Sequence, residues 1–422
     1  MLGTVVRRQS LDHNMFRIFL ARCFLSACQA LGAVLIPIYL TVLGFSAVKL
    51  GMLFLAVTSA SAILSTAVGI VSDRIGRKPF LVGIPLVVAV AGIILAFTTN
   101  PVVLFIVIPL SSFGRGFGAG AGSVTFYQPA EAAYVMGMSE PSKRNQLFAR
   151  LTFASSLGSV IGNAVVGGMS AKHLHAGSVL TVMRPFFLIS TGLSLMAALS
   201  VIKITEEPRD TTPVKRHIMP VRSSAILRRF IVSNGVTGLA IGVYAPFISY
   251  WFFKVYAAGP GEIGRLFAVA NVVAGISSLG AGAVARRYGS VWTVFWLRLG
   301  QSVLFFAMVY AHHFLLAGVF YTIYVVGQRV GIALRQSYVV AMADPSERGA
   351  VVALSNLPSE VAQASMSPVA GWLIESSGLL APFLVSASLQ FLNGFLYLWM
   401  FLRHRPDDEL AKPIETARVI DT

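Results

Sequence analysis

The stretch GIVSDRIGRK, from Gly69 to Lys78, separates two long apolar runs and decides the fold of this 422-residue chain. Small residues such as Gly69 let membrane helices approach closely, and Gly76 permits a tight turn between them. Asp73 can accept hydrogen bonds from Arg77 or from backbone amides at a helix N-terminus. We therefore interpret the stretch as a conformational latch. The alternative interpretation is a positively charged topology signal with a capping aspartate.

The composition around this stretch is that of an integral membrane protein. Hydrophobic residues make up 56% of the chain and charged residues only 12%, whereas a typical soluble domain is about 25% charged. A bilayer core requires about 20 apolar residues of a spanning helix. The run FLVGIPLVVAVAGIILAF, residues 80–97, is apolar throughout and lacks the alternation of a barrel strand. We expect an all-α membrane protein.

Hydropathy divides the chain into twelve expected transmembrane helices and one central hydrophilic loop. The expected helices are residues 15–43, 47–71, 78–98, 101–138, 144–170, 177–202, 225–256, 261–285, 290–311, 313–343, 347–375 and 379–402. The expected domains are an N-terminal six-helix bundle, a central cytoplasmic loop, a C-terminal six-helix bundle and a cytoplasmic tail, at residues 1–202, 203–224, 225–403 and 404–422.

The basic residues, which give a net charge of +16, gather in alternate loops. Cytoplasmic loops are rich in Lys and Arg, so the pattern predicts a multi-pass protein of the cytoplasmic (inner) membrane with both termini inside. This distribution argues against nucleic acid as a partner. The two cysteines, Cys23 and Cys28, lie in the first apolar run and predict neither a disulfide framework nor a metal site.

A repeated segment indicates that the chain consists of two related halves. YVMGMSEPSKRN, residues 134–145, recurs as YVVAMADPSERG at residues 338–349, an offset of 204. GIVSDRIGRK has a degraded counterpart, GAVARRYGSV, at residues 282–291. Parallel repeats of this kind occur in one large transporter fold. The same offset sets Glu131 against Arg335, and we hypothesise that these two residues form a charge pair or gate.

With these features the chain resembles the major facilitator superfamily, whose signature loop it matches at Gly69, Asp73, Arg74, Gly76, Arg77 and Lys78. The resemblance implies the superfamily fold, with two pseudo-symmetric six-helix bundles, and secondary transport by alternating access. In many members an acidic residue near the cytoplasmic end of helix four joins the latch. Gly137 occupies that position here, so either Glu131 or Glu140 replaces the acidic residue or the relay is incomplete.

Helix four also contains GRGFGAGAG, residues 114–122. A dinucleotide-binding loop would need a preceding strand, so the glycines are interpreted as helix-packing residues. Arg115 at mid-helix is costly in lipid and should face a cavity or an acidic partner; the alternative is a structural arginine bonded to carbonyls. Its pattern resembles the fourth-helix motif of proton-coupled members. With the intramembrane carboxylates Glu131 and Glu360, Arg115 is a candidate for proton coupling.

Helix five carries GSVIGNAVVGG, which is similar to the antiporter motif of the superfamily. The motif's proline is missing, because Asn163 follows Gly162, and one extra residue precedes Gly167. Helix packing and a mechanistic role for these glycines both remain open.

By the same resemblance, helices one, four, seven and ten should line the substrate cavity. The cavity candidates are Gln29, Arg115, Glu131, Tyr244, Arg329 and Arg335. The resemblance to drug-efflux-like bacterial members implies proton-coupled export of amphipathic compounds. The excess of intramembrane arginine favours an alternative, proton-coupled uptake of a small organic anion. A transport-inactive sensor on the same fold is the alternative of another class.

No enzyme motif stands out in the sequence. It has no G-x-x-x-x-G-K-[ST] loop, zinc-protease pattern or nucleophile elbow. The pairs His173 with His175 and His312 with His313 fall in expected outer loops and are interpreted as solvated residues rather than metal ligands. We expect a monomeric transporter without a cofactor, whose partners are a small-molecule substrate, protons or another coupling ion, and membrane lipid.

Overall fold

The computed structural model describes residues 2–113, 125–138, 144–169, 178–205, 223–278, 289–344 and 348–402. Within these ranges every regular element is a helix. Eight of the helices in the described ranges are long and apolar enough to cross a membrane. Apart from a turn at Ser112 and Phe113 and a few residues at the ends of spans, the described part of each of the twelve expected spans is helical. The expectation of an all-helical membrane protein is therefore confirmed.

The chain forms two compact units. Unit 1 comprises Met1–Thr212, Ala245–Val272 and Ser367–Leu379, and unit 2 comprises Pro213–Tyr244, Val273–Met366 and Leu380–Thr422. The boundaries of these units cut the seventh, eighth and eleventh expected helices. The division into bundles at residues 1–202 and 225–403 therefore stays a prediction.

The elements that begin in unit 1 are α1 (Leu2–Val42), α2 (Ala47–Ile75), α3 (Lys78–Phe97), α4 (Pro101–Ser111), η2 (Thr125–Tyr127), α5 (Gln128–Met138), α6 (Arg144–Gly167), α7 (Val179–Val201), η4 (Ala245–Phe247), α9 (Ile248–Tyr256) and α10 (Pro260–Ser278). The elements that begin in unit 2 are α8 (Ser224–Tyr244), α12 (Ser290–Val309), α13 (Phe314–Met342), α14 (Arg348–Ser377) and α15 (Ala381–Phe401).

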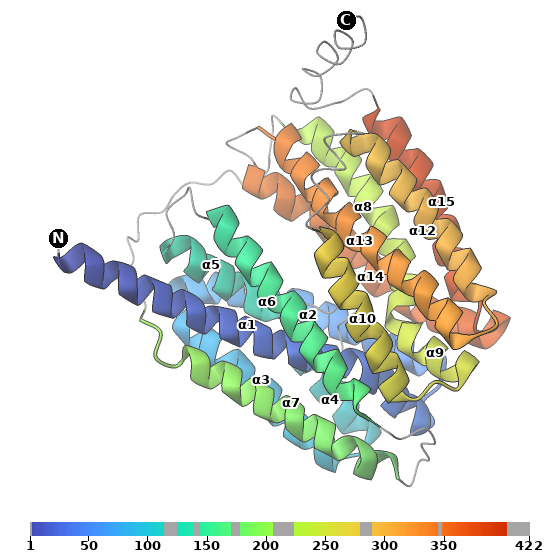
Figure 1. Ribbon diagram of the computed structural model, residues 1–422, viewed down its shortest axis with the longest axis horizontal. Coiled ribbons are helices and arrows are strands. Elements are labelled where there is room, and N and C mark those ends of the chain that lie inside the picture. Colours follow the sequence, from blue (N-terminus) through green and yellow to red (C-terminus); the bar gives the residue numbers. More distant parts are fainter. Residues whose placement is uncertain are drawn as a thin grey trace, which may run out of the picture. The chain divides into compact units, whose positions relative to one another are not determined.

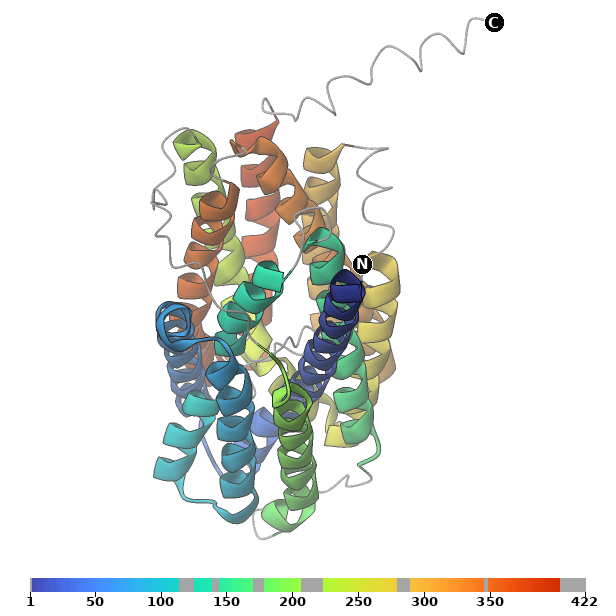
Figure 2. The same ribbon diagram turned by 90° about the vertical axis from the view of Figure 1, so that its left-hand side faces the viewer.

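In unit 1, α1 packs along α6 and α7, and α3 packs along α7 (Figure 1). Figure 2 shows α3 and α7 side by side from another direction. Small residues make the closest crossing possible, because a Cβ at Gly158 or Gly162 would collide with the backbone of α1 at Cys23 or Ala27. These contacts favour the helix-packing interpretation of the glycines in helix five.

Local sequence accounts for several of the helix ends. Asn100 caps α4 with its Oδ1, which accepts a hydrogen bond of 2.9 Å from the backbone nitrogen of Val102, as N-cap asparagines do. Gly76 ends α2 at φ 109°, and Gly289 precedes α12 at φ 79°. Both values favour glycine. The two glycines correspond at the offset of 213, so the degraded repeat has kept the backbone turn.

In unit 2, α12 packs against α13 and α15, and α15 packs against α8 (Figure 1). One end of this arrangement is an aromatic core. The ring of Phe230 on α8 lies 4.8 Å from that of Phe401 on α15 and 5.9 Å from that of Tyr338 on α13. This buried cluster fixes three helices whose other residues form the polar site described below.

Candidate functional site

A buried ion pair lies inside unit 1. Arg22 on α1 bonds through Nη1 to Oε2 of Glu131 in the first turn of α5. Its Nε also donates a hydrogen bond of 2.6 Å to Ser155 Oγ on α6. Glu131 is only 1% exposed, and among the described residues its Oε1 has no hydrogen-bond partner. Three helices thus meet around one intramembrane carboxylate.

The pair brings together a buried carboxylate and the arginine that compensates its charge. An isolated charge at membrane depth is costly, and a neighbouring opposite charge offsets much of that cost. A proton competes with Arg22 for the carboxylate, so protonation of Glu131 would release the arginine. The repeat alignment proposed Arg335 as the partner of Glu131, whereas the structure gives it Arg22.

Further buried polar groups lie on α1 and α6. Gln29 is 2% exposed, and its Nε2 has no partner among the described residues. The side chain of Asn163 is fully buried, and both its amide atoms lack a described partner. Asn163 stands where the antiporter motif has proline. Unsatisfied polar groups of this kind are rare in packed interiors and often mark functional positions.

The structure shows what Arg77 of the predicted latch contacts when Gly137 stands in place of an acidic residue. The Nη1 of Arg77 donates to the carbonyl oxygen of Ala133 on α5, and its Nη2 lies 3.8 Å from Asp73 Oδ1. A Cβ at Gly137 would lie 2.7 Å from Arg77 Nη1. The missing side chain therefore makes room for the guanidinium group, and a backbone carbonyl takes the place of the carboxylate.

The other residues of the predicted latch differ in what they contact. Gly69 faces α5, since its Cβ would lie 3.8 Å from that of Pro129. Lys78 begins α3. Arg74 is exposed and has no partner among the described residues. The latch contact itself therefore rests on Arg77. Glu140, the other proposed acidic substitute, lies outside the described residues.

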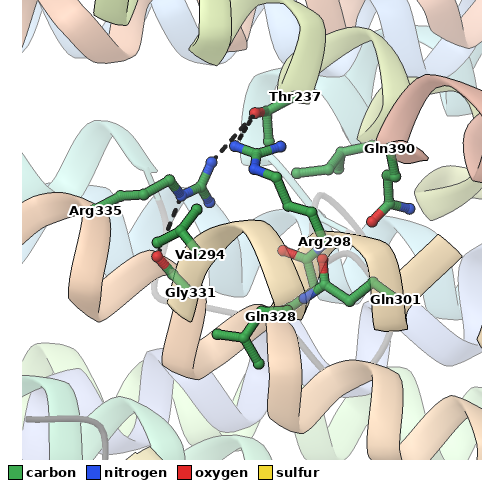
Figure 3. A pocket seen from close by; sticks show the side chains of 10 residues that line it. Thr237, Val294, Arg298, Gln301, Gln328, Gly331, Arg335 and Gln390 are labelled. Carbon is green, nitrogen blue, oxygen red and sulfur yellow. Dashed lines mark hydrogen bonds between the residues drawn. The ribbon is translucent and has the colours of Figure 1, made fainter. Parts of the chain in front are cut away.

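Unit 2 contains a second polar site, built from two arginines around one hydroxyl. Arg298 Nη2 on α12 and Arg335 Nη1 on α13 donate to Thr237 Oγ1 on α8, at 2.8 and 3.2 Å (Figure 3). Arg335 Nε also donates to the carbonyl oxygen of Gly331. All three side chains belong to candidate membrane spans. No motif surrounds Arg298, so its place in this site had no signal in the sequence.

Two spaces adjoin this site. The larger is a cavity of about 270 Å³, lined by residues of α8, α13 and α14 that include Arg335 and Glu360; we call it the unit 2 cavity. The smaller, of about 10 Å³, shares Thr237 and Arg335 with it and adds Arg298; we call it the arginine recess. Gln301, Gln328 and Gln390 complete the recess (Figure 3).

Tyr244, a predicted cavity residue, packs against the ring of Phe305 at 4.7 Å. Its hydroxyl accepts a hydrogen bond of 2.8 Å from that of Tyr324. Tyr324 in turn accepts bonds from Nε2 of Gln328 and Gln390. Tyr244 therefore supports the recess through Tyr324, a role that its position in helix seven did not reveal.

The remaining predicted residues are placed as follows. Arg329 lies on α13, and the linings of these two spaces do not include it. Arg115 lies outside the described residues, as do His173 and His175. His312 and His313 are exposed. Among the described residues no three His, Cys, Asp or Glu side chains gather as a metal site would require.

Two hydrogen bonds join neighbouring helices at one end of unit 1. The distribution of basic residues in the loops predicts that this end faces outside. Ser249 Oγ on α9 donates to the carbonyl oxygen of Ala33 on α1, at 3.0 Å. Arg265 Nη1 on α10 donates to the carbonyl oxygen of Gly167 on α6, at 2.8 Å. Segments from both halves of the sequence therefore meet at this end of unit 1.

We predict that Gly264→Ala weakens the contacts at this end of unit 1. A Cβ at Gly264 would lie 2.7 Å from the nitrogen of Gly167 and 2.8 Å from the carbonyl oxygen of Asn163. Overpacking costs about 1–3 kcal/mol, which changes a ratio of two states by about 5- to 150-fold. Labelling of Ala33→Cys by an impermeant maleimide should therefore rise. Ala33 is buried, and the substitution keeps the backbone carbonyl that accepts the bond from α9. Gly275→Ala on the same helix is the control, because its Cβ meets nothing within 4 Å.

The fold and these sites define a membrane protein that carries polar groups at membrane depth on helices from two sequence halves. The model of the Major Facilitator Superfamily matches residues 18–237 and 230–420. The chain therefore belongs to the Major Facilitator Superfamily. It is a multi-pass membrane transporter of that superfamily, and not an enzyme.

Among its relatives, Multidrug resistance protein 2 of Bacillus subtilis (strain 168) is 22% identical over 270 residues, which are 62% of this chain and 64% of that protein. Multidrug resistance protein MdtH of Edwardsiella ictaluri (strain 93-146) is 23% identical over 321 residues, 73% of each chain. The chain thus covers less than two thirds of the Bacillus relative.

Solved structures with the same fold include the nucleoside transporter NupG, at a TM-score of 0.70 and 15% identity over 93% of this chain and 99% of that chain. A D-xylose–proton symporter matches at a TM-score of 0.66 and 14% identity, over 96% of this chain and 98% of that one. At this level of identity the likeness shows the fold alone.

Proposed function

We propose that the chain exports amphipathic small molecules from the cell in exchange for protons, by alternating access. The observation that carries the proposal is the buried pair of Arg22 and Glu131. Proton coupling needs a group that binds a proton inside the membrane. Glu131 meets that need, because it is buried, has one oxygen without a described partner and has its other oxygen held by a displaceable arginine.

Conformational change supplies the second part of the proposal. The latch at Arg77 ties α5 to the loop between α2 and α3, and the outer contacts of Ser249 and Arg265 close one end of unit 1. Contacts of this kind must break when the site opens to the other side. Protonation of Glu131, which frees Arg22 from α5, would bias that change.

The direction of transport rests on the relatives. Both the Bacillus and the Edwardsiella proteins carry names of multidrug resistance, which supports export. The alternative of proton-coupled anion uptake has a specific observation in its favour, the two arginines at Thr237. In that case Glu360, which lines the same cavity as Arg335, would bind the proton, because a neutral carboxyl repels an anion less.

Flux into proteoliposomes under an imposed pH gradient tests the proposal. The panel contains compounds of fixed charge, namely a lipophilic quaternary ammonium cation and an aromatic sulfonate, and protein-free liposomes are the control. We expect accumulation when the lumen is acidic, because protons leave as cargo enters. Accumulation only with an alkaline lumen would establish proton-coupled uptake. Binding without flux in either direction would establish a sensor.

A further inference from the structure

The surroundings of Thr237 contain more hydrogen-bond donors than acceptors. Its Oγ1 lies within bonding distance of Arg298 Nη2, Arg335 Nη1 and Asn393 Nδ2, and it donates its own proton to the carbonyl oxygen of Ser233. A hydroxyl oxygen has only two lone pairs, so three donors cannot all be satisfied by it. The excess favours an additional acceptor at this point.

Arg298 shows the same excess from its own side. It is only 5% exposed, and its Nε has no hydrogen-bond partner among the described residues. The ring of Tyr397, 5.6 Å from its Cζ, offers a cation–π contact but no full counter-charge. A buried guanidinium is costly unless an anion or acceptors compensate it.

Among the residues that the structure describes, no carboxylate supplies that compensation in the recess. The residues that line the arginine recess include Arg298 and Arg335 but no Asp or Glu. The unit 2 cavity contains one carboxylate, Glu360, opposite the positive charge of Arg335. The described lining of the two spaces together therefore carries a net positive charge.

The dimensions fit a compact anionic group with a larger body. The recess, at about 10 Å³, has room for about one water molecule or one ligand oxygen. The adjoining cavity, at about 270 Å³, lies at the lower end of the range for small-molecule sites. Ile241 and Val294 add apolar surface to the recess, and Gln301, Gln328 and Gln390 add amide groups.

We propose, building on the proposed function, that this site binds the anionic group of the cargo, a carboxylate, sulfonate or phosphate. Arg298 and Arg335 donate to its oxygens, as guanidinium groups do with planar anions. Thr237 holds the two arginines in place (Figure 3). The cargo is then an amphipathic anion, whose apolar part occupies the unit 2 cavity.

The proposal is tested by isothermal titration of the purified full-length protein with 2-naphthalenesulfonate, 2-naphthoate and neutral 2-naphthamide. We expect the two anions to bind and the amide to bind much more weakly. Loss of one charge-assisted contact should weaken anion binding about 10- to 100-fold. Arg298→Gln and Arg335→Gln should each show this loss. Thr237→Val should weaken binding, whereas Thr237→Ser should restore it.

Two controls make the result specific. Arg184→Gln removes a half-buried arginine of unit 1 that bonds the carbonyl oxygen of Ala96, and it should leave anion affinity unchanged. Monodisperse size-exclusion profiles establish that each variant is folded. Titration with and without added phosphatidylglycerol distinguishes a lipid phosphate from a free anion, because a lipid-filled site would bind the sulfonate only in lipid-free detergent.

Different experimental outcomes would overturn the anion site and the proposed function. Equal affinity for 2-naphthamide, or anion binding that is unchanged in Arg298→Gln and Arg335→Gln, would overturn the anion site. Exchange of a quaternary ammonium cation for protons would then still support export. Specific binding of the sulfonate without accumulation in acidic proteoliposomes would leave the anion site standing and reject proton-coupled export.

Discussion

Glu131→Gln abolishes accumulation driven by a pH gradient while exchange of cargo without a gradient continues. Glutamine keeps the shape of the side chain but cannot bind and release a proton, so the cycle loses its coupling step. The measurement is uptake of a fixed-charge compound into proteoliposomes with an acidic lumen. Glu360→Gln is the matched variant, because it removes the other candidate carboxylate and should retain coupling. Full accumulation in Glu131→Gln would reject Glu131 as the coupling group.

The same substitution should destabilise the protein. Breaking a buried ion pair costs about 3–5 kcal/mol because it leaves the partner charge uncompensated. Arg22 is that partner here, and its remaining bond goes to Ser155. Thermal unfolding in detergent should therefore occur at a lower temperature in Glu131→Gln than in the double variant Arg22→Gln/Glu131→Gln. A double variant no more stable than the single one would show that the pair contributes little.

Arg77→Gln should reduce the rate of transport about 10- to 100-fold, because a hydrogen bond from a charged group contributes about 1.5–3 kcal/mol. Arg77 makes the latch contact with the carbonyl oxygen of Ala133 and lies near Asp73. Loss of the contact removes the preference for one access state. The populations of the two access states then change, and the transport cycle slows. Initial rates of uptake measure the effect.

The control for this variant is Arg74→Gln, three positions earlier in the last turn of α2. Arg74 is exposed, so its removal lowers the cytoplasmic charge by the same amount without touching the latch contact. If these arginines served only as a topology signal, either substitution should lower the transport rate equally, because such a signal depends only on the number of positive charges. Equal rates in the two variants would therefore support the topology interpretation over the latch.

The helices were predictable because a bilayer imposes a local requirement on each of them. About 20 apolar residues must follow one another, and every expected span is mainly helical where the structure describes it. The turn at Gly76 and its counterpart at Gly289 were likewise visible as a repeated local pattern. The 3-10 turn η2, which interrupts the expected helix of residues 101–138, was less visible in the sequence.

Pairings between distant residues were not predictable from the same signals. Arg22 and Glu131 lie 109 positions apart, and the repeat alignment pointed to Arg335 because it compares equivalent positions rather than neighbours in space. Arg298 and Thr237 lie 61 positions apart, and neither belongs to a recognisable motif. Gly137 was read as a missing acid, whereas packing against Arg77 explains it.

The central claim is that cargo and protons move in opposite directions, and direct measurement of proton movement tests it. Proteoliposomes with an entrapped pH-sensitive dye are prepared at equal pH on both sides, and a transported compound of fixed charge is then added outside. The account predicts that the lumen becomes alkaline as cargo enters, and that Glu131→Gln shows no change. Acidification of the lumen as cargo enters would contradict it.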